Sequence, residues 1–274
     1  MVNLLVAAAL AAASPASAPD PAPQATEPAM FMVRDADTTI YIFGTFHALD
    51  GHKDWFGQHV RDAFEQSNEL VLETLVPEQP NQIVLLPTPG FKPPSMTPSA
   101  SFLATTRMAI SAGRSQGMQV DNGADMVLRH VAEAEGKTVE GLETLQSQLD
   151  MFNRLPSSPQ PTPAVAPAPR PGQKVAIGGN PMQSLSNAMS EMQTAWKRGD
   201  QSVFVRMLGQ LESASPATYR MMFTERNTRW ADWIRARMQR PGTVFVAVGA
   251  GHLAGKDSLL VRLAERGIPS QRVN

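Results

Sequence analysis

Short runs of β-branched and aromatic residues alternate along the chain with longer stretches in which apolar residues recur every three or four positions. The short runs are typical of buried strands, and the periodic stretches are typical of helices that cover a sheet. Strands are predicted at residues 30–33, 39–43, 69–72, 137–141 and 243–248, with a final edge strand at 268–273. Because strands and helices alternate, the pattern predicts an α/β fold: a central, mostly parallel sheet flanked by helices.

The periodic stretches predict helices between these strands. The longest begins at Ser215-Pro216, where a capping residue precedes a proline at the first helical position, and it runs to about Gln239. Further helices are predicted at residues 54–68, 101–111, 122–135, 144–153, 181–198, 200–211 and 257–266.

Two proline-rich stretches interrupt this pattern. Residues 76–98 contain seven prolines and predict an irregular segment that could cover the strand ends. Residues 154–180 are of low complexity and cannot bury enough apolar surface to order themselves. We expect a disordered insertion there, within a single domain of residues 30–274, because matched motifs lie on both sides of it.

The N-terminus resembles a secretory signal peptide. Residues 4–13 are apolar and Ala-rich, and Ala16-Ser17-Ala18 has the A-x-A pattern of a cleavage site, although no Lys or Arg precedes the apolar run. We expect a signal peptide at residues 1–18, a linker at 19–29, and a periplasmic or secreted protein; the alternative is an Ala-rich tail. No other stretch is long enough to predict a transmembrane helix in the mature protein.

Composition narrows the chemistry. Cysteine is absent, which excludes disulfides, thiolate nucleophiles and thiolate zinc sites. A net charge of −1 gives no electrostatic reason to expect a nucleic-acid partner.

Two predicted strands end in the same motif, Gly-x-x-His. The strand at 39–43 is followed by Gly44-Thr45-Phe46-His47, and the strand at 243–248 by Gly249-Ala250-Gly251-His252. Glycines allow a sharp turn, and open α/β sheets place their ligands at the carboxyl ends of strands. The two copies predict that His47 and His252 form the two halves of one site. The alternative is that each turn only ends a strand, with its histidine bonded to backbone.

Two further strand ends deliver Glu73 and Glu143. Two imidazoles and two carboxylates in one cleft suit a divalent metal such as zinc, manganese, cobalt or iron. We expect His47, His252 and Glu73 to bind it, so that hydrolysis needs no protein nucleophile, with a glutamate as possible general base. The alternative is that Glu73 and Glu143 cap the helices that follow them.

The longest predicted helix carries Arg226 and Asn227 on the side that also bears Trp230 and Ile234. The two apolar residues are expected in the core. Arg226 and Asn227 could reach the cleft to hold a substrate carboxylate or to orient Glu143; the alternative is an exposed Arg and a structural Asn. The other histidines, His52, His59 and His130, are expected at the surface or as satisfied core residues.

The segments FGTFHALD, SNELVLE, ADMVLRHVAEAEGKTVEGLETLQSQL, ERNTRWADWI and FVAVGAGHLAGKDSLLVRLAERG occur in this order. Together they resemble the TraB/GumN family, which includes the Tiki proteins, from about Phe31 to Val273. The resemblance implies an α/β fold related to the ChaN and erythromycin-esterase (EreA) folds. It also implies an active site with two Gly-x-x-His motifs, which in Tiki proteins looks like that of a metal-dependent protease.

Carried over by position, the resemblance implies binding glycines at Gly44 and Gly249 and functional side chains at His47, Glu73, Glu143, Arg226, Asn227 and His252. Asp125 lies where the family's middle motif has an acidic residue. The resulting hypothesis is an exported, metal-dependent hydrolase that acts on peptides or another small substrate. The alternatives are a non-catalytic envelope protein that binds haem, iron or polysaccharide, and a metal-independent esterase with His as base.

Overall fold

The computed structural model describes residues 27–75, 111–156 and 181–274. Within them six strands form one mixed sheet in the order β4-β3-β5-β2-β1-β6. Neighbours among β2, β3, β4 and β5 are parallel, whereas β1 and β6 extend the sheet antiparallel beyond β2. The predicted α/β fold with a mostly parallel sheet is therefore confirmed. The strands are β1 (Met30–Arg34), β2 (Thr38–Thr45), β3 (Glu69–Thr74), β4 (Thr138–Glu143), β5 (Gly242–Gly249) and β6 (Gln271–Arg272).

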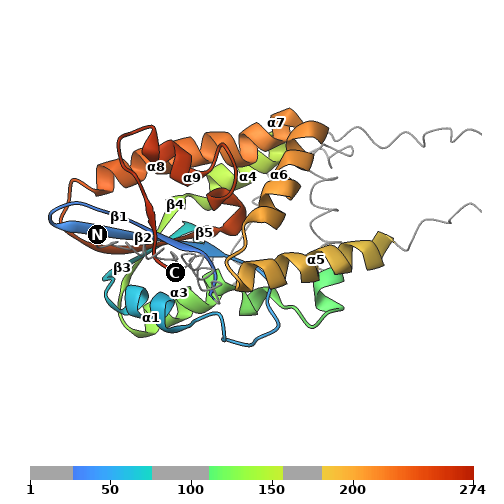
Figure 1. The fold of residues 1–274 in the computed structure, drawn as a ribbon, viewed down its shortest axis with the longest axis horizontal. Helices are drawn as coiled ribbons and strands as arrows, with labels where there is room; N and C mark the ends of the chain where they lie inside the picture. The colour runs from blue at the N-terminus through green and yellow to red at the C-terminus, as the bar shows by residue number, and fades with distance from the viewer. Residues whose placement is uncertain (1–26, 76–110, 157–180) are drawn as a thin grey trace, which may run out of the picture.

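Helices cover both faces of the sheet: α1 and α3 lie on one face, and α8 and α9 on the other (Figure 1). In the described part of the chain, no helix is both long and apolar enough to cross a membrane. The predicted signal peptide, the stretch 76–98 and residues 157–180 of the predicted insertion lie outside the described residues. The helices are α1 (Gln58–Glu65), α3 (Ala124–Ala134), α4 (Leu145–Arg154), α5 (Pro181–Lys197), α6 (Ser202–Ala214), α7 (Pro216–Tyr219), α8 (Glu225–Arg237) and α9 (Leu259–Ala264), with short turns η2 (Val120–Asn122), η3 (Arg220–Thr224) and η4 (Ala250–Leu253).

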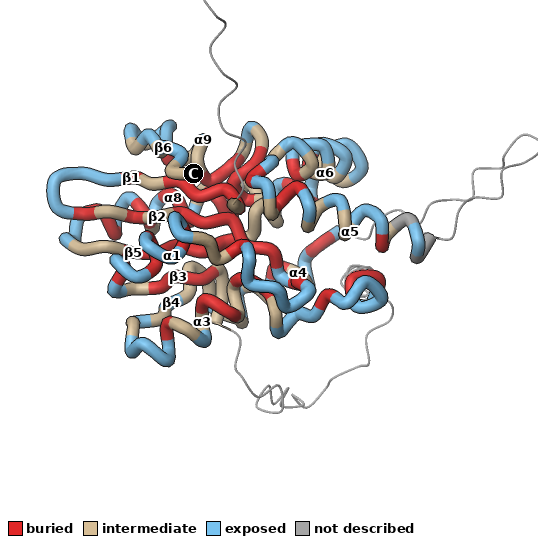
Figure 2. The backbone as a smooth tube through the Cα atoms, turned by 60° about the horizontal axis from the view of Figure 1, so that its bottom comes forward, coloured by how far each residue is buried: buried red, intermediate tan, exposed pale blue. Residues whose placement is uncertain are grey.

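The buried core follows the middle of the sheet (Figure 2). Alternate side chains of one strand belong to different clusters: Phe43 packs with the helices α1 and α3, and Ile42 packs with α8 and α9. Burying a side chain of this size contributes about 1.5–3 kcal/mol, so a slip of one residue in register would expose both sets. The core therefore fixes the register of the strands, and with it the position of their carboxyl ends.

The helix predicted from Ser215 to Gln239 is interrupted. Pro216 occupies its first position as expected. The segment Arg220–Thr224 then forms a turn of π-helix before α8 begins at Glu225. A π turn inserts one residue relative to an α-helix, and such turns often lie at functional sites.

Candidate functional site

The carboxyl ends of the four parallel strands meet at one edge of the sheet, and each delivers a predicted site residue. His47 follows β2, Glu73 is the penultimate residue of β3, Glu143 ends β4, and His252 lies in the turn η4 directly after β5. The structure brings all four to one region of the molecule.

Gly249 is the point around which three of these side chains gather. A Cβ added at Gly249 would lie 3.1 Å from Glu73 Oε1, 3.3 Å from His47 Nε2 and 3.7 Å from His252 Cδ2. Two of these approaches are tighter than most Cβ contacts, so a side chain at residue 249 would push Glu73 and His47 outward by a few tenths of an ångström. The first and last histidine-bearing turns therefore contribute to one site.

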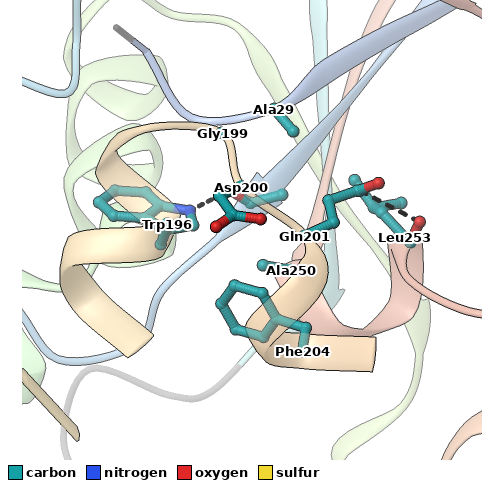
Figure 3. Close-up of a pocket in the computed structure, with 9 residues that line it drawn as sticks. Ala29, Trp196, Gly199, Asp200, Gln201, Phe204, Ala250 and Leu253 are labelled. Atoms are coloured by element: carbon teal, nitrogen blue, oxygen red, sulfur yellow. Dashed lines mark hydrogen bonds between the residues drawn. The ribbon is translucent and has the colours of Figure 1, made fainter. Parts of the chain in front are cut away.

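The two turns also pack directly against each other and are held by one helical connection. A Cβ at Gly44 would lie 3.2 Å from Ala250 Cα. Trp196 Nε1, near the end of α5, donates to Gly44 O at 2.7 Å, and Gln201 Nε2, just before α6, donates to Leu253 O at 3.1 Å (Figure 3). These two side-chain hydrogen bonds, which we call the braces, hold the backbone of both turns. The sequence did not predict them.

His252 is buried and held in one tautomer. Its Nδ1 lies 2.7 Å from Asn227 Oδ1, and Asn227 Nδ2 donates to Asp257 O at 2.8 Å. The second bond orients the amide so that its oxygen faces the imidazole, which places the proton on Nδ1 and leaves Nε2 as an acceptor. The ring centroids of Phe223 and Trp230 lie 4.9 Å and 4.4 Å from the centroid of the imidazole. Burial lowers the pKa of His252 to about 3, so it is neutral at pH 7.

His47 is in the opposite situation. Its side chain is 57% exposed, and Nδ1 lies 3.2 Å from Oδ1 of Asp125, which is in the first turn of α3. The negative charge of Asp125 raises the pKa of His47 above its ordinary value. Within the described residues no hydrogen bond reaches Nε2 of His47, which is the nitrogen nearer to Gly249.

Arg226 connects the second histidine with both glutamates. Its guanidinium donates from Nη2 to Glu73 Oε2 at 2.7 Å and from Nε to Glu143 Oε2 at 3.0 Å, and Nη1 lies 3.2 Å from His252 Nε2. Burial alone would raise the pKa of Glu73, but the charge of Arg226 holds that pKa below its usual range. Arg226 is therefore a buried cation inside the site, as one of the two sequence interpretations expected.

Glu143 is not a helix cap. Thr144 takes that position, because its Oγ1 accepts from Ser147 N at 3.1 Å at the start of α4. The Glu143 carboxylate instead accepts from Arg226 and Arg229 and from Trp230 Nε1. These donors occupy the carboxylate oxygens, so Glu143 is suited to hold the Arg226 guanidinium in its orientation. Glu73 likewise accepts from the backbone, with Gly249 N 2.7 Å from its Oε1.

A cleft of about 510 Å³ opens beside these groups. Its lining includes His47, Glu73, Arg226 and His252, together with Gly249. The remaining walls are mostly apolar and come from α4, α5, α6 and η3: Phe152, Met189, Met192, Phe204, Met207, Met222 and Phe223. Asn227 and Glu143 are not in the lining, so within the described structure they act through His252 and Arg226.

Among the described residues, no group of three or more His, Asp or Glu side chains lies in an arrangement that could hold a metal ion. His252 Nε2 and Glu73 Oε1 are 3.7 Å apart, and the cation they contact is Arg226. The remaining histidines, His52, His59 and His130, are exposed, which is one of the two alternatives that the sequence left open.

Comparison with known proteins gives one match. The model of the TraB/PrgY/gumN family matches residues 29–100 and 88–272. No curated protein matches the chain, and neither does any solved structure. The relation to the ChaN and erythromycin-esterase folds therefore stays a prediction.

Proposed function

The chain belongs to the TraB/PrgY/gumN family, and we propose that it is a metal-dependent hydrolase that cleaves peptide bonds in the cleft. The observation that carries this proposal is the convergence of His47, His252 and Glu73 around Gly249. The turns after β2 and β5 carry the two histidines to Glu73 near the end of β3, beside a cleft large enough for part of a peptide.

The donor chemistry fits a divalent cation such as zinc, manganese, cobalt or iron. Two imidazoles and one carboxylate are a common ligand set, and in each imidazole Nδ1 is engaged. Nε2 of His47 lies near Gly249, and Nε2 of His252 lies 3.7 Å from Glu73 Oε1. Ligating histidines are usually oriented in this way by a carboxylate or a carbonyl oxygen behind them. When bound, such a cation would supply Lewis-acid chemistry for hydrolysis. To ligate through Nε2, His252 must exchange its contact with Arg226 Nη1 for the cation.

The protein's own residues prepare this donor set. Asn227 keeps Nε2 of His252 unprotonated. Arg226 keeps Glu73 ionised, and the Gly249 N–H fixes one carboxylate oxygen. Arg226 also lines the cleft, so it can orient a substrate carbonyl or carboxylate.

The test is metal analysis and peptide cleavage by the purified full chain. We expect bound divalent metal in the wild type, loss of metal and of cleavage in His47→Ala and His252→Ala, and no change in the exposed-histidine control His130→Ala. EDTA should abolish cleavage, and added metal should restore it. Equal metal content and equal cleavage in the wild type and both site variants would refute the proposal.

One observation favours a second candidate, a metal-independent esterase. Arg226 already places a cation against Glu73 and His252, and the two histidines have pKa values shifted in opposite directions, as an acid and a base require. Hydrolysis of esters that is insensitive to EDTA would favour this candidate. A Soret band on addition of haem, with no hydrolysis, would instead favour a binding protein.

We also propose export, on the basis of the apolar run at residues 4–13 and the Ala16-Ser17-Ala18 site. N-terminal sequencing of the protein from the extracytoplasmic fraction should begin near residue 19. Recovery of the full-length chain in the cytoplasm alone would contradict this.

A further inference from the structure

Methionine and phenylalanine make up most of the apolar lining of the cleft. Among the described residues four methionines line it: Met189 and Met192 from α5, Met207 from α6 and Met222 from η3. Methionine is unbranched and polarizable, so it adapts to apolar groups of different shape. Phe152 and Phe223 complete this wall, which we call the methionine wall. A surface of this kind, next to candidate catalytic groups, suits a large apolar group of the substrate.

Apart from the site residues, two polar side chains lie in the lining, Thr45 and Gln148. Thr45 is 2% exposed and its Oγ1 is covered by protein atoms, so a ligand in the cleft does not reach that hydroxyl. Gln148 lines the cleft from α4 and is partly exposed, and within the described part of the chain its side-chain amide makes no hydrogen bond. Its amide is therefore available to a ligand.

The Gln148 amide favours a peptide over an ester-linked acyl chain, because it offers both donors and an acceptor. A peptide backbone presents an N–H and a C=O to such a group, whereas an acyl ester has no donor. The combination of an apolar wall and an amide-matching group therefore fits a hydrophobic peptide segment.

We propose that the cleft selects peptides with a large apolar side chain next to the scissile bond. The methionine wall binds that side chain, and the Gln148 amide pairs with the adjacent peptide backbone. This inference rests on the proposed function, whose substrate class it specifies.

The test compares peptides that differ in one residue beside the scissile bond. We expect kcat/KM to be about 10- to 100-fold higher with Leu, Met or Phe at this position than with Gly, Asp or Lys, as burial of one side chain allows. Binding is measured separately, by calorimetry with ketomethylene analogues of the same peptides, which cannot be hydrolysed.

Variants in α6 locate the effect. Met207→Lys should reduce the preference for apolar residues at least 10-fold and favour an acidic residue, and the uncharged Met207→Gln should weaken the preference without reversing it. The matched control is Val205→Lys on the same helix, because Val205 is exposed and does not line the cleft. Its selectivity should equal that of the wild type.

The outcomes separate this inference from the proposed function. Apolar-selective binding of the analogues without any cleavage supports the inference and removes the hydrolase. Cleavage without apolar preference, or selectivity unchanged in both Met207 variants, overturns the inference and leaves the hydrolase in place. Binding of fatty-acyl esters with no binding of any peptide analogue overturns the inference as well.

Discussion

The two Gly-x-x-His turns share a sequence pattern and a position at the end of a parallel strand, yet their histidines are in opposite states. His252 is buried between two aromatic rings and is neutral, with its Nδ1–H bonded to Asn227. His47 is more than half exposed, and the charge of Asp125 favours its cationic form.

The difference arises from the elements packed against each turn. The turn after β5 lies against α8, which supplies Asn227, Trp230 and Arg226. The turn after β2 faces the start of α3, which supplies a carboxylate. The motif therefore sets where the backbone goes, and the neighbouring helix sets the chemistry of the imidazole.

The largest expected effect on stability comes from removing the guanidinium of Arg226, which lies beside His252. Arg226→Met leaves Glu73 and Glu143 buried without their shared partner, and we expect the free energy of unfolding to fall by about 3–5 kcal/mol. Arg229→Met is the control, because Arg229 pairs with the same Glu143 from an exposed position and should cost less than about 1 kcal/mol. Chemical denaturation measures both, and equal losses would contradict the contrast.

Replacing each histidine with alanine should also destabilise the protein unequally, with smaller losses than for Arg226. We expect His252→Ala to cost about 2–4 kcal/mol, because it leaves a cavity between two rings and removes the partner of Asn227. His47→Ala should change stability by no more than about 0.5 kcal/mol, because the side chain is largely exposed. Metal-free protein is used, so that loss of a bound ion does not add to either value.

The residue behind each histidine gives the next comparison. Asn227→Ala leaves a buried Nδ1–H without its acceptor and should cost about 1–3 kcal/mol. Asp125→Ala removes an ion pair with an exposed partner and should cost about 0–1 kcal/mol. Thermal unfolding of the two variants under one buffer condition measures the difference; a larger loss for Asp125→Ala would reverse our interpretation.

The smallest effects are expected at the braces of the two turns. Trp196→Phe removes the donor to Gly44 O, and Gln201→Ala removes the donor to Leu253 O, so each should cost about 0.5–1.5 kcal/mol. Because Gly44 packs on Ala250, the two losses should not be additive in the double variant. Strict additivity would mean that the turns are held independently.

The sequence predicted the sheet and the convergence of its strand ends because both depend on local patterns. The alternation at residues 39–43 and 243–248 predicts strands, and the glycines after them predict turns. The approach of Arg226 to Glu143 was one of the two predicted alternatives, because helical spacing places that arginine beside core residues. Asp125 was placed by resemblance alone, and its contact with His47 depends on how α3 packs.

Other parts of the site could not be predicted in this way. Trp196, Gln201 and the Asp257 carbonyl contact the two turns or Asn227 from distant parts of the chain, and no periodicity signals those contacts. The methionine wall is assembled from separate helices, and the sequence of each helix shows only an amphipathic pattern. The π turn was missed because one additional residue hardly alters an apolar pattern over a long helix.

That π turn at Arg220–Thr224 sets the angular phase of everything after it in the helix. Each residue of an α-helix advances the chain by about 100°, and the π turn accommodates one additional residue, so straightening it into regular α-helix without a deletion would swing Arg226 and Asn227 about a quarter of a revolution from their partners. A point substitution removes one contact, but such straightening would disengage the guanidinium and the amide in a single step while leaving every side chain of the site in the sequence.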